Sequence, residues 1–114
     1  MIAGGTVRTP ECRLSLISAV NGGIAALPKS VAERGLGDCI HINLIQPGTI
    51  QTHAAAQEGI EYAEYLLDSR GRWKITPLGE PGDVAELVAF LATEEAKWIH
   101  GATLDVDGRQ SKGV

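Results

Sequence analysis

The stretch CIHINLIQPG, residues 39–48, decides the fold class. Apolar side chains at positions 40, 42 and 44 recur with the two-residue period of a β-strand, and Ile45 makes the opposite face apolar as well. A strand that is apolar on both faces is typical of a parallel sheet covered on both sides. Gln46-Pro47-Gly48 follows at once and ends the strand. The stretch therefore predicts a buried parallel strand over Cys39–Ile45, with a tight turn behind it.

A long helix is predicted before this strand, over Ser15–Arg34, with Ser15 at the N-cap. Its apolar stripe, at helical spacing, consists of Ile17, Val20, Ile24, Leu27 and Val31. Pro28 removes a backbone hydrogen bond in mid-helix, so we expect a kink there. Gly35 and Gly37 are expected to end the helix, because glycine readily adopts the left-handed conformation of a C-terminal cap.

Behind the strand, the segment Pro77–Lys97 predicts a second helical element. Pro81 suits the first helical turn, and Asp83 stands near the positive end of the helix dipole. Thr103–Val106 then predicts a short strand closed by an Asp-Gly turn. A strand, a helix and a second strand in this order predict a right-handed parallel crossover.

Length and composition exclude several classes of protein. A chain of 114 residues predicts one domain. A net charge of −4 with scattered Lys and Arg residues gives no basic patch, so we expect no nucleic-acid partner. We expect no membrane partner either, because no run looks long and apolar enough to span a bilayer. Without a charged-then-apolar N-terminal pattern, the expected location is the cytoplasm.

The cysteines and histidines carry no metal signature. Cys12 and Cys39 form no C-x-x-C pair, so two free thiols are the simpler interpretation and a disulfide is the alternative. His41, His53 and His100 lack the spacing of metal ligands. We therefore predict no metal site.

Four short motifs, taken together, resemble one family. They are Ile42-Asn43-x-x-x-Pro47-Gly48-x-Ile50-x-Thr52, Pro77-x-Gly79-x-Pro81-x-Asp83-Val84-Ala85, Phe90-Leu91-Ala92 and Gly101-x-Thr103-Leu104-x-Val106-Asp107-Gly108. In order and spacing they resemble the C-terminal half of the short-chain dehydrogenases/reductases.

The resemblance implies an α/β fold, the C-terminal part of a Rossmann-like doubly wound parallel sheet. Residues 1–114 would form a single partial domain with the order helix, strand, helical loop, helix and strand. Residues 53–80, partly rich in alanine and glutamate, would be a helical insertion like the family's substrate loop. The complete family fold would bind NAD or NADP. Because the Gly-rich phosphate turn is absent from these residues, none is expected to bind this chain alone.

The resemblance also implies where a cofactor would lie. Pro47, Gly48, Ile50 and Thr52 match the turn that borders the nicotinamide in the family. The alternative is a plain strand-ending turn, which any parallel strand needs.

The chain departs from the family at the catalytic positions. Aligned on the family helix, Ile17 stands where the acid/base tyrosine is expected and Asn21 where the lysine is expected. The family's serine falls near Thr6. Ketone reduction needs a proton donor beside the carbonyl oxygen, and isoleucine has no proton to give. The sequence thus predicts a divergent type without catalytic residues of the usual kind.

Three interpretations of function stay open. The chain is the truncated part of an NAD(P)-dependent oxidoreductase and inactive in isolation, a non-catalytic interaction or oligomerisation module, or a gene remnant. In the family fold, the outer neighbour of the strand Cys39–Ile45 comes from the missing half, which would leave an unpaired apolar edge. We therefore expect a homo-oligomer or pairing with a complementary N-terminal half. The sequence names no substrate.

Overall fold

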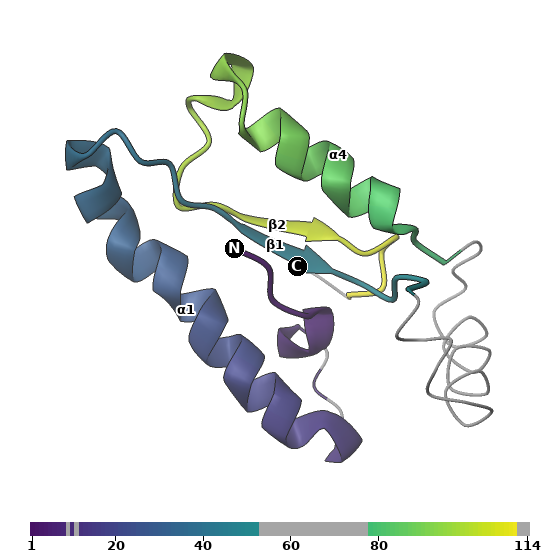
Figure 1. The fold of residues 1–114 in the computed structure, drawn as a ribbon. Coiled ribbons are helices and arrows are strands. Elements are labelled where there is room, and N and C mark those ends of the chain that lie inside the picture. The colour runs from purple at the N-terminus through teal and green to yellow at the C-terminus, as the bar shows by residue number, and fades with distance from the viewer. Residues whose placement is uncertain (9, 11, 53–77, 112–114) are drawn as a thin grey trace.

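The computed structural model describes residues 1–8, 10, 12–52 and 78–111. Two parallel strands lie between two helices, one on each side of the sheet (Figure 1). In chain order the elements are η1 (Gly5–Val7), η2 (Cys12–Leu14), α1 (Ser15–Gly37), β1 (Leu44–Pro47), α4 (Pro81–Leu91), η3 (Glu94–Ala96) and β2 (Thr103–Val106), where η marks a 3₁₀-helix. The parallel α/β architecture that the sequence predicts is confirmed.

The strand β1 has a neighbour on both of its edges. On one side it pairs in parallel with β2, Leu44 opposite Thr103. On the other side the N-terminal residues form a parallel bridge, in which the Ala3 N–H donates to the Ile45 carbonyl at 3.0 Å. The Ile45 N–H in turn donates to the Met1 carbonyl at 2.9 Å. The prediction that this strand would be left with an unpaired edge is therefore wrong, because residues Met1–Ala3 bond to that edge.

Helix α1 is confirmed and is longer than predicted. It runs unbroken through Pro28, whose side chain is buried, and ends at Gly37. Ser15 is its first helical residue rather than its N-cap, because η2 leads directly into it. Gly35 lies so close to the following chain that a Cβ atom there would meet the Ile40 carbonyl oxygen at 2.6 Å. The glycine thus lets the chain turn back tightly toward β1.

Helix α4 begins as its sequence predicts. Pro81 occupies the first turn, and the Glu80 N–H donates to Asp83 Oδ2 at 2.7 Å within a reciprocal capping box. The single helical element expected over Pro77–Lys97 is divided, since α4 ends at Leu91 and η3 follows. Of the helical insertion predicted over residues 53–80, residues 53–77 lie outside the described residues.

The core is small and centred on β1. Its buried apolar side chains, among the residues that the structure describes, are Ala3, Leu44, Ile45, Leu78 and Ala96. Large apolar side chains remain exposed at the N-terminus, on both helices and just after η3. They include Met1, Ile2, Leu16, Ile17, Val20, Leu27, Val88, Phe90 and Trp98. The two helices therefore cover the strands on their inner faces while their outer faces stay open.

The α1 region is also apolar enough to meet the length and composition of a membrane span. The segment Cys12–Gly35 has a mean hydropathy of 1.2 over its most apolar window, and only 6% of that window is buried. This differs from the sequence-based expectation that no run qualifies, because the charged residues of α1 cluster at its end, at Lys29, Glu33 and Arg34. A helix that packs against another protein surface has the same composition, so this composition alone is not evidence that α1 crosses a membrane.

Candidate functional site

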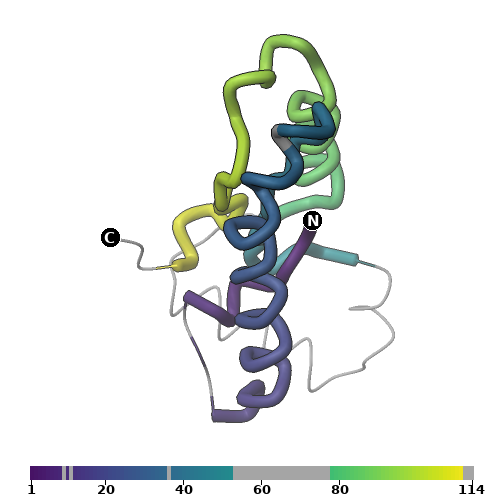
Figure 2. Tube along the Cα trace, turned by 90° about the vertical axis from the view of Figure 1, so that its left-hand side faces the viewer, coloured from purple at the N-terminus to yellow at the C-terminus, as the bar shows by residue number. Residues whose placement is uncertain are grey.

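The candidate site lies at the carboxyl edge of the sheet, where β1 and β2 end side by side at Pro47 and Val106 (Figure 1). The N-terminal segment reaches the same edge, since η1 follows the bridge at Ile2 and packs against α1 (Figure 2). Carboxyl ends of parallel strands are where α/β proteins gather their binding groups. Three distant parts of the sequence therefore meet here.

The Pro47-Gly48 turn is in close backbone contact with the end of β2. The Gly48 N–H donates to the Val106 carbonyl at 2.9 Å. A Cβ atom at Gly48 would meet the Cα of Asp107 at 2.7 Å, which real Cβ atoms do not tolerate. Glycine is therefore required at position 48 by close approach of the backbone, and the turn has little freedom to shift.

Thr49 is held by a side chain from the segment after β2. Its N–H donates to Gln110 Oε1 at 2.5 Å, and Gln110 Nε2 donates to Thr49 Oγ1. Ile50 bridges in parallel to Gly79, where the Gln51 N–H donates to the Gly79 carbonyl at 2.8 Å. The other predicted site residue, Thr52, is exposed just beyond this bridge. The four residues predicted to border a cofactor, Pro47, Gly48, Ile50 and Thr52, therefore lie in succession along the carboxyl edge of the sheet.

An open cavity of about 320 Å³ borders this turn. It is lined by Thr49, Ile50, Leu78, Gly79, Asp83, Val106, Asp107, Gly108 and Gln110. The volume lies at the lower end of the range for small-molecule sites. Its walls come from the segment after β1, from the end of β2 with the turn behind it, and from the start of α4 with the residues just before it.

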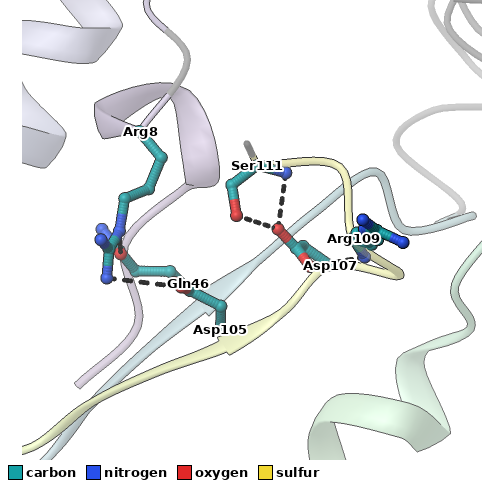
Figure 3. A network of polar contacts seen from close by, with 6 residues as sticks. All are labelled: Arg8, Gln46, Asp105, Asp107, Arg109 and Ser111. Atoms are coloured by element: carbon teal, nitrogen blue, oxygen red, sulfur yellow. Dashed lines mark hydrogen bonds and ion pairs between the residues drawn. The ribbon is translucent and has the colours of Figure 1, made fainter. Parts of the chain in front are cut away.

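Asp107 organises the chain after β2 (Figure 3). Its Oδ1 accepts from the Arg109 N–H at 2.8 Å, and its Oδ2 accepts from the Ser111 N–H at 2.7 Å and from the Ser111 hydroxyl. Partial burial works to raise the pKa of Asp107, but these hydrogen bonds, the hydroxyl first, outweigh it and hold the pKa below its usual 3.8. Asp107 is therefore ionised at neutral pH, as the fixed point of a turn.

A hydroxyl and an amide meet beside the turn. Asn21 Nδ2, on α1, donates to Thr6 Oγ1, in η1, at 3.1 Å. A Cβ atom at Gly4 would meet that same Nδ2 at 2.9 Å, and one at Gly5 would meet the Pro47 carbonyl oxygen at 3.0 Å. Two successive glycines therefore let the pair approach the Pro47-Gly48 turn. Ile17, one helical turn before Asn21, has 52% of its surface exposed.

A polar network that the sequence did not predict joins Arg8, Gln46 and Asp105 (Figure 3). Arg8 Nε donates to Gln46 Oε1 at 3.2 Å, and Arg8 Nη2 lies 3.3 Å from Asp105 Oδ2. Gln46 is almost fully buried in β1, while the Arg8 and Asp105 side chains are partly exposed. The network joins the N-terminal segment to both strands. No periodic signal in the sequence connects these three positions.

At the opposite, amino-terminal end of β1, Asn43 and His100 have structural roles. Asn43 Nδ2 donates to the Ile99 carbonyl at 2.8 Å, and its Oδ1 accepts from the Ala102 N–H at 3.1 Å. His100 Nδ1 accepts from the Ile42 N–H at 3.1 Å, so its Nε2, 2.6 Å from the Ala32 carbonyl oxygen, must carry the proton and donate. These bonds fasten β1 to the turn before β2 and to α1.

The described part of the chain holds no group of three His, Cys, Asp or Glu side chains placed to bind a metal ion. Cys12 and Cys39 are free and exposed, which confirms the expectation of two free thiols. His41 and His100 lie with their ring centres 5.5 Å apart, but His100 already uses both ring nitrogens.

Comparisons with known proteins identify the family. A family model described as enoyl-(acyl carrier protein) reductase matches residues 2–108. The 7alpha-hydroxysteroid dehydrogenase of Bacteroides fragilis is 36% identical over 100 residues, which cover 88% of this chain and 38% of that protein. The NADP-dependent (R)-specific alcohol dehydrogenase of Lentilactobacillus kefiri is 32% identical, and the match covers 83% of this chain and 38% of the dehydrogenase. The chain belongs to the short-chain dehydrogenase/reductase family, whose members are NAD(P)-dependent oxidoreductases.

The solved structures agree on the fold. The L-sorbose reductase of Gluconobacter frateurii, solved with NADPH and L-sorbose, superposes with a TM-score of 0.88 at 22% identity, over 99% of this chain and 46% of that chain. The Rossmann-like class expected from the sequence is confirmed. The chain spans about two fifths of the length of the curated relatives it matches.

Proposed function

We propose that this chain forms the nicotinamide-facing and carbonyl-facing part of an NAD(P)-dependent oxidoreductase and does not catalyse hydride transfer by itself. The observation that carries the proposal is the Thr6–Asn21 pair beside the Pro47-Gly48 turn. Family membership supports the cofactor, because the comparisons include proteins solved with NADPH, NADP or NADH.

The residues present fit one end of such a cofactor better than the other. At the carboxyl edge, Asn21 offers a second amide hydrogen, and Thr6 keeps its own hydroxyl hydrogen because the bond from Asn21 occupies only an oxygen lone pair. These groups suit ribose hydroxyls and a carboxamide, with the Pro47–Thr52 turn as the wall. Phosphates would need a glycine-rich turn before a helix N-terminus, and none of the 114 residues forms that motif. When bound, the cofactor would donate or accept a hydride.

The chain's own residues perform only part of carbonyl chemistry. The Thr6 hydroxyl, which accepts from Asn21, would donate its hydrogen to a carbonyl oxygen. Delivering a full proton needs a titratable acid, and Ile17 at the corresponding helix position has none. We therefore assign no catalytic acid to this chain, and expect no turnover from the 114 residues alone.

The test is a titration of NADPH and NADH, followed by fluorescence, against two proteins. The first is this chain, and the second is a chimera in which it replaces the matching region of the B. fragilis dehydrogenase. We expect saturable binding by the chimera and none by the chain alone. Binding by the chain alone, or by neither protein while the chimera is folded, would contradict the proposal.

A double replacement in the chimera tests the missing acid. Ile17→Tyr together with Asn21→Lys should raise oxidation of a 7α-hydroxysteroid by about 10²–10⁴-fold, the usual contribution of a positioned acid or base. The matched control is Ile17→Phe with Asn21→Lys, which adds the ring without the hydroxyl and should leave the rate low. Equal rates in the two variants would show that the acid is supplied elsewhere.

A second candidate function, an interaction module, is favoured by the outer face of α1. Leu16 has 77% of its surface exposed, and Val20 and Leu27 are exposed on the same helix. Burying such a face against a second copy, or against a complementary N-terminal half, would stabilise both. We expect sedimentation of the purified chain to show a dimer, and a Leu16→Glu, Val20→Lys variant to shift it to monomer. A monodisperse wild-type monomer would exclude self-association.

We further propose a cytoplasmic location without a nucleic-acid or membrane partner. Two free exposed thiols suit a reducing compartment, and the net charge of −4 does not favour phosphate backbones. Cell fractionation checks this, because recovery in the membrane pellet after a salt wash would point to the apolar face of α1 instead.

A further inference from the structure

We infer that Gln110 is a positioning residue that fixes the Pro47–Thr49 turn, so that the segment after β2 sets the shape of the proposed cofactor wall. The functional meaning of the inference rests on the proposed function, whereas the clamp itself is a property of this chain. Neither a motif nor the family match singles out position 110, which lies beyond the matched residues 2–108.

The orientation of the Gln110 amide is determined by its partners. The Thr49 N–H can only donate, so the atom facing it at 2.5 Å must be the amide oxygen. The amide nitrogen then faces Thr49 Oγ1 and donates to it. One side chain thus holds both the main chain and the side chain of a single residue, a two-point contact that fixes position and orientation together.

The base of the clamp is itself rigid. The Gln110 N–H donates to the Asp107 carbonyl at 3.0 Å, and the Asp107 carboxylate accepts from the N–H groups of Arg109 and Ser111 on either side of position 110. Gly108 and Arg109 have φ angles of 56° and 69°, which close the turn tightly. Gln110 is therefore presented toward Thr49 by a turn that these hydrogen bonds hold together.

The other side of Thr49 is held more weakly. Its carbonyl accepts from the Gly79 N–H at 3.2 Å, and Thr49 and Gln110 both line the 320 Å³ cavity. If the Gln110 amide were lost, the Thr49 N–H would face the cavity without its present acceptor, and the turn would gain freedom toward the open space. The paired strand below would keep its bonds, because Gly48 is tied separately to Val106.

The experiment is hydrogen exchange at individual amides of the 114-residue chain, measured by NMR for the wild type and two variants. Gln110→Leu keeps the volume and removes both hydrogen bonds. Gln110→Glu keeps them, since a carboxylate accepts from the Thr49 N–H and from a reversed Thr49 hydroxyl. We expect Thr49 exchange to be about tenfold faster in Gln110→Leu and to return to within about threefold of the wild type in Gln110→Glu. Arg109→Asn, which tolerates the same φ angle, is the matched control and should change neither rate.

Two results would overturn the inference. One is unchanged Thr49 exchange in Gln110→Leu. The other is equal acceleration at Thr49 and at Leu44 in mid-sheet, which would indicate general loosening rather than a clamp. If Gln110→Leu does not fold, Thr49→Ala removes only the hydroxyl half, and its residue-49 amide should exchange about threefold faster; an unchanged rate there also refutes the two-point contact. The exchange result is independent of cofactor titration, so a failure of the proposed function would be recognised separately.

Discussion

The two ends of β1 use the same kind of bond for different results. At the amino-terminal end, the side chains of Asn43 and His100 form hydrogen bonds to backbone groups. At the carboxyl-terminal end, the Thr6 hydroxyl and the Asn21 amide keep hydrogens to donate beside the Pro47-Gly48 turn. A polar group that is fully paired stabilises a fold, whereas one that is half paired is available to a ligand. The comparison predicts large stability effects at the first end and small ones at the second.

The largest effect is expected at Asn43. Asn43→Leu, of similar size, leaves the Ile99 carbonyl and the Ala102 N–H without partners at a buried position. We expect unfolding in urea to lose about 3 kcal/mol of free energy, from two unmade hydrogen bonds. Gln51→Leu, an exposed amide beyond the other end of the strand, is the control and should change stability by less than about 0.5 kcal/mol. Similar losses in both variants would break the comparison.

A smaller effect is expected at His100. His100→Phe preserves the ring and removes the bonds to Ile42 and Ala32, so stability should fall by about 2 kcal/mol. Because Ala32 belongs to α1, amide exchange in the last turns of that helix should accelerate more than exchange in α4. The exposed His41 gives the matched variant, His41→Phe, for which we expect little change. Equal acceleration of amide exchange in α1 and α4 would contradict the inference that His100 holds α1 locally.

At the carboxyl end, removing the Thr6–Asn21 bond should cost little. Asn21→Leu and Thr6→Val are each expected to reduce stability by about 1 kcal/mol, the usual worth of one partly exposed hydrogen bond. The double variant should lose less than the sum, since both changes remove the same bond. Losses as large as those at Asn43 would show that this pair is structural, and would remove the reason for proposing a ligand there.

The smallest effect on stability is expected at low pH, from the Asp107 carboxylate. The pKa of Asp107 is lowered in the folded chain, so its ionised form contributes stability above the usual value of 3.8, and this contribution is lost as pH falls through the lower folded pKa. Asp107→Asn should therefore be less sensitive to acid than the wild type below pH 3.8, while being slightly less stable at neutral pH. Thermal melts from neutral pH to below this range measure it. Parallel pH profiles for the two proteins would contradict the pKa direction.

Local patterns predicted the elements well and their long-range partners poorly. The strand Thr103–Val106 has the bounds that its alternation indicates, and α1 and α4 follow from apolar spacing and capping residues. The strand predicted over Cys39–Ile45 begins only at Leu44, because Ile42 bonds to His100 and Gly101 instead of to a neighbouring strand. It also continues through Gln46 to Pro47, because both residues pair with β2. Periodicity describes one segment at a time, so it could not show which residues beyond the strand would take those bonds.

The candidate site divides in the same way. Pro47 and Gly48 could be found from sequence, because a strand-ending turn has a compositional signature. Gln110 and the Arg8–Gln46–Asp105 network could not, since their contacts join residues 38 to 97 positions apart and leave no local pattern. The edge of β1 was expected to be unpaired, because its family neighbour lies in the missing half, and only the three-dimensional arrangement shows that residues Met1–Ala3 bridge to it.

The exposed thiols at the two ends of α1 are sites for probes that would report how two copies of the helix are oriented. Cys12 precedes its first residue and Cys39 follows its last, so probes attached to them would be about 35 Å apart along a helix of 23 residues. If two copies associate through their α1 faces in antiparallel fashion, spin labels on Cys12 of one copy and Cys39 of the other would come close. A parallel association would bring like labels together instead. Single-cysteine samples, labelled and mixed, would thus reveal the polarity of any assembly without a change near the carboxyl edge.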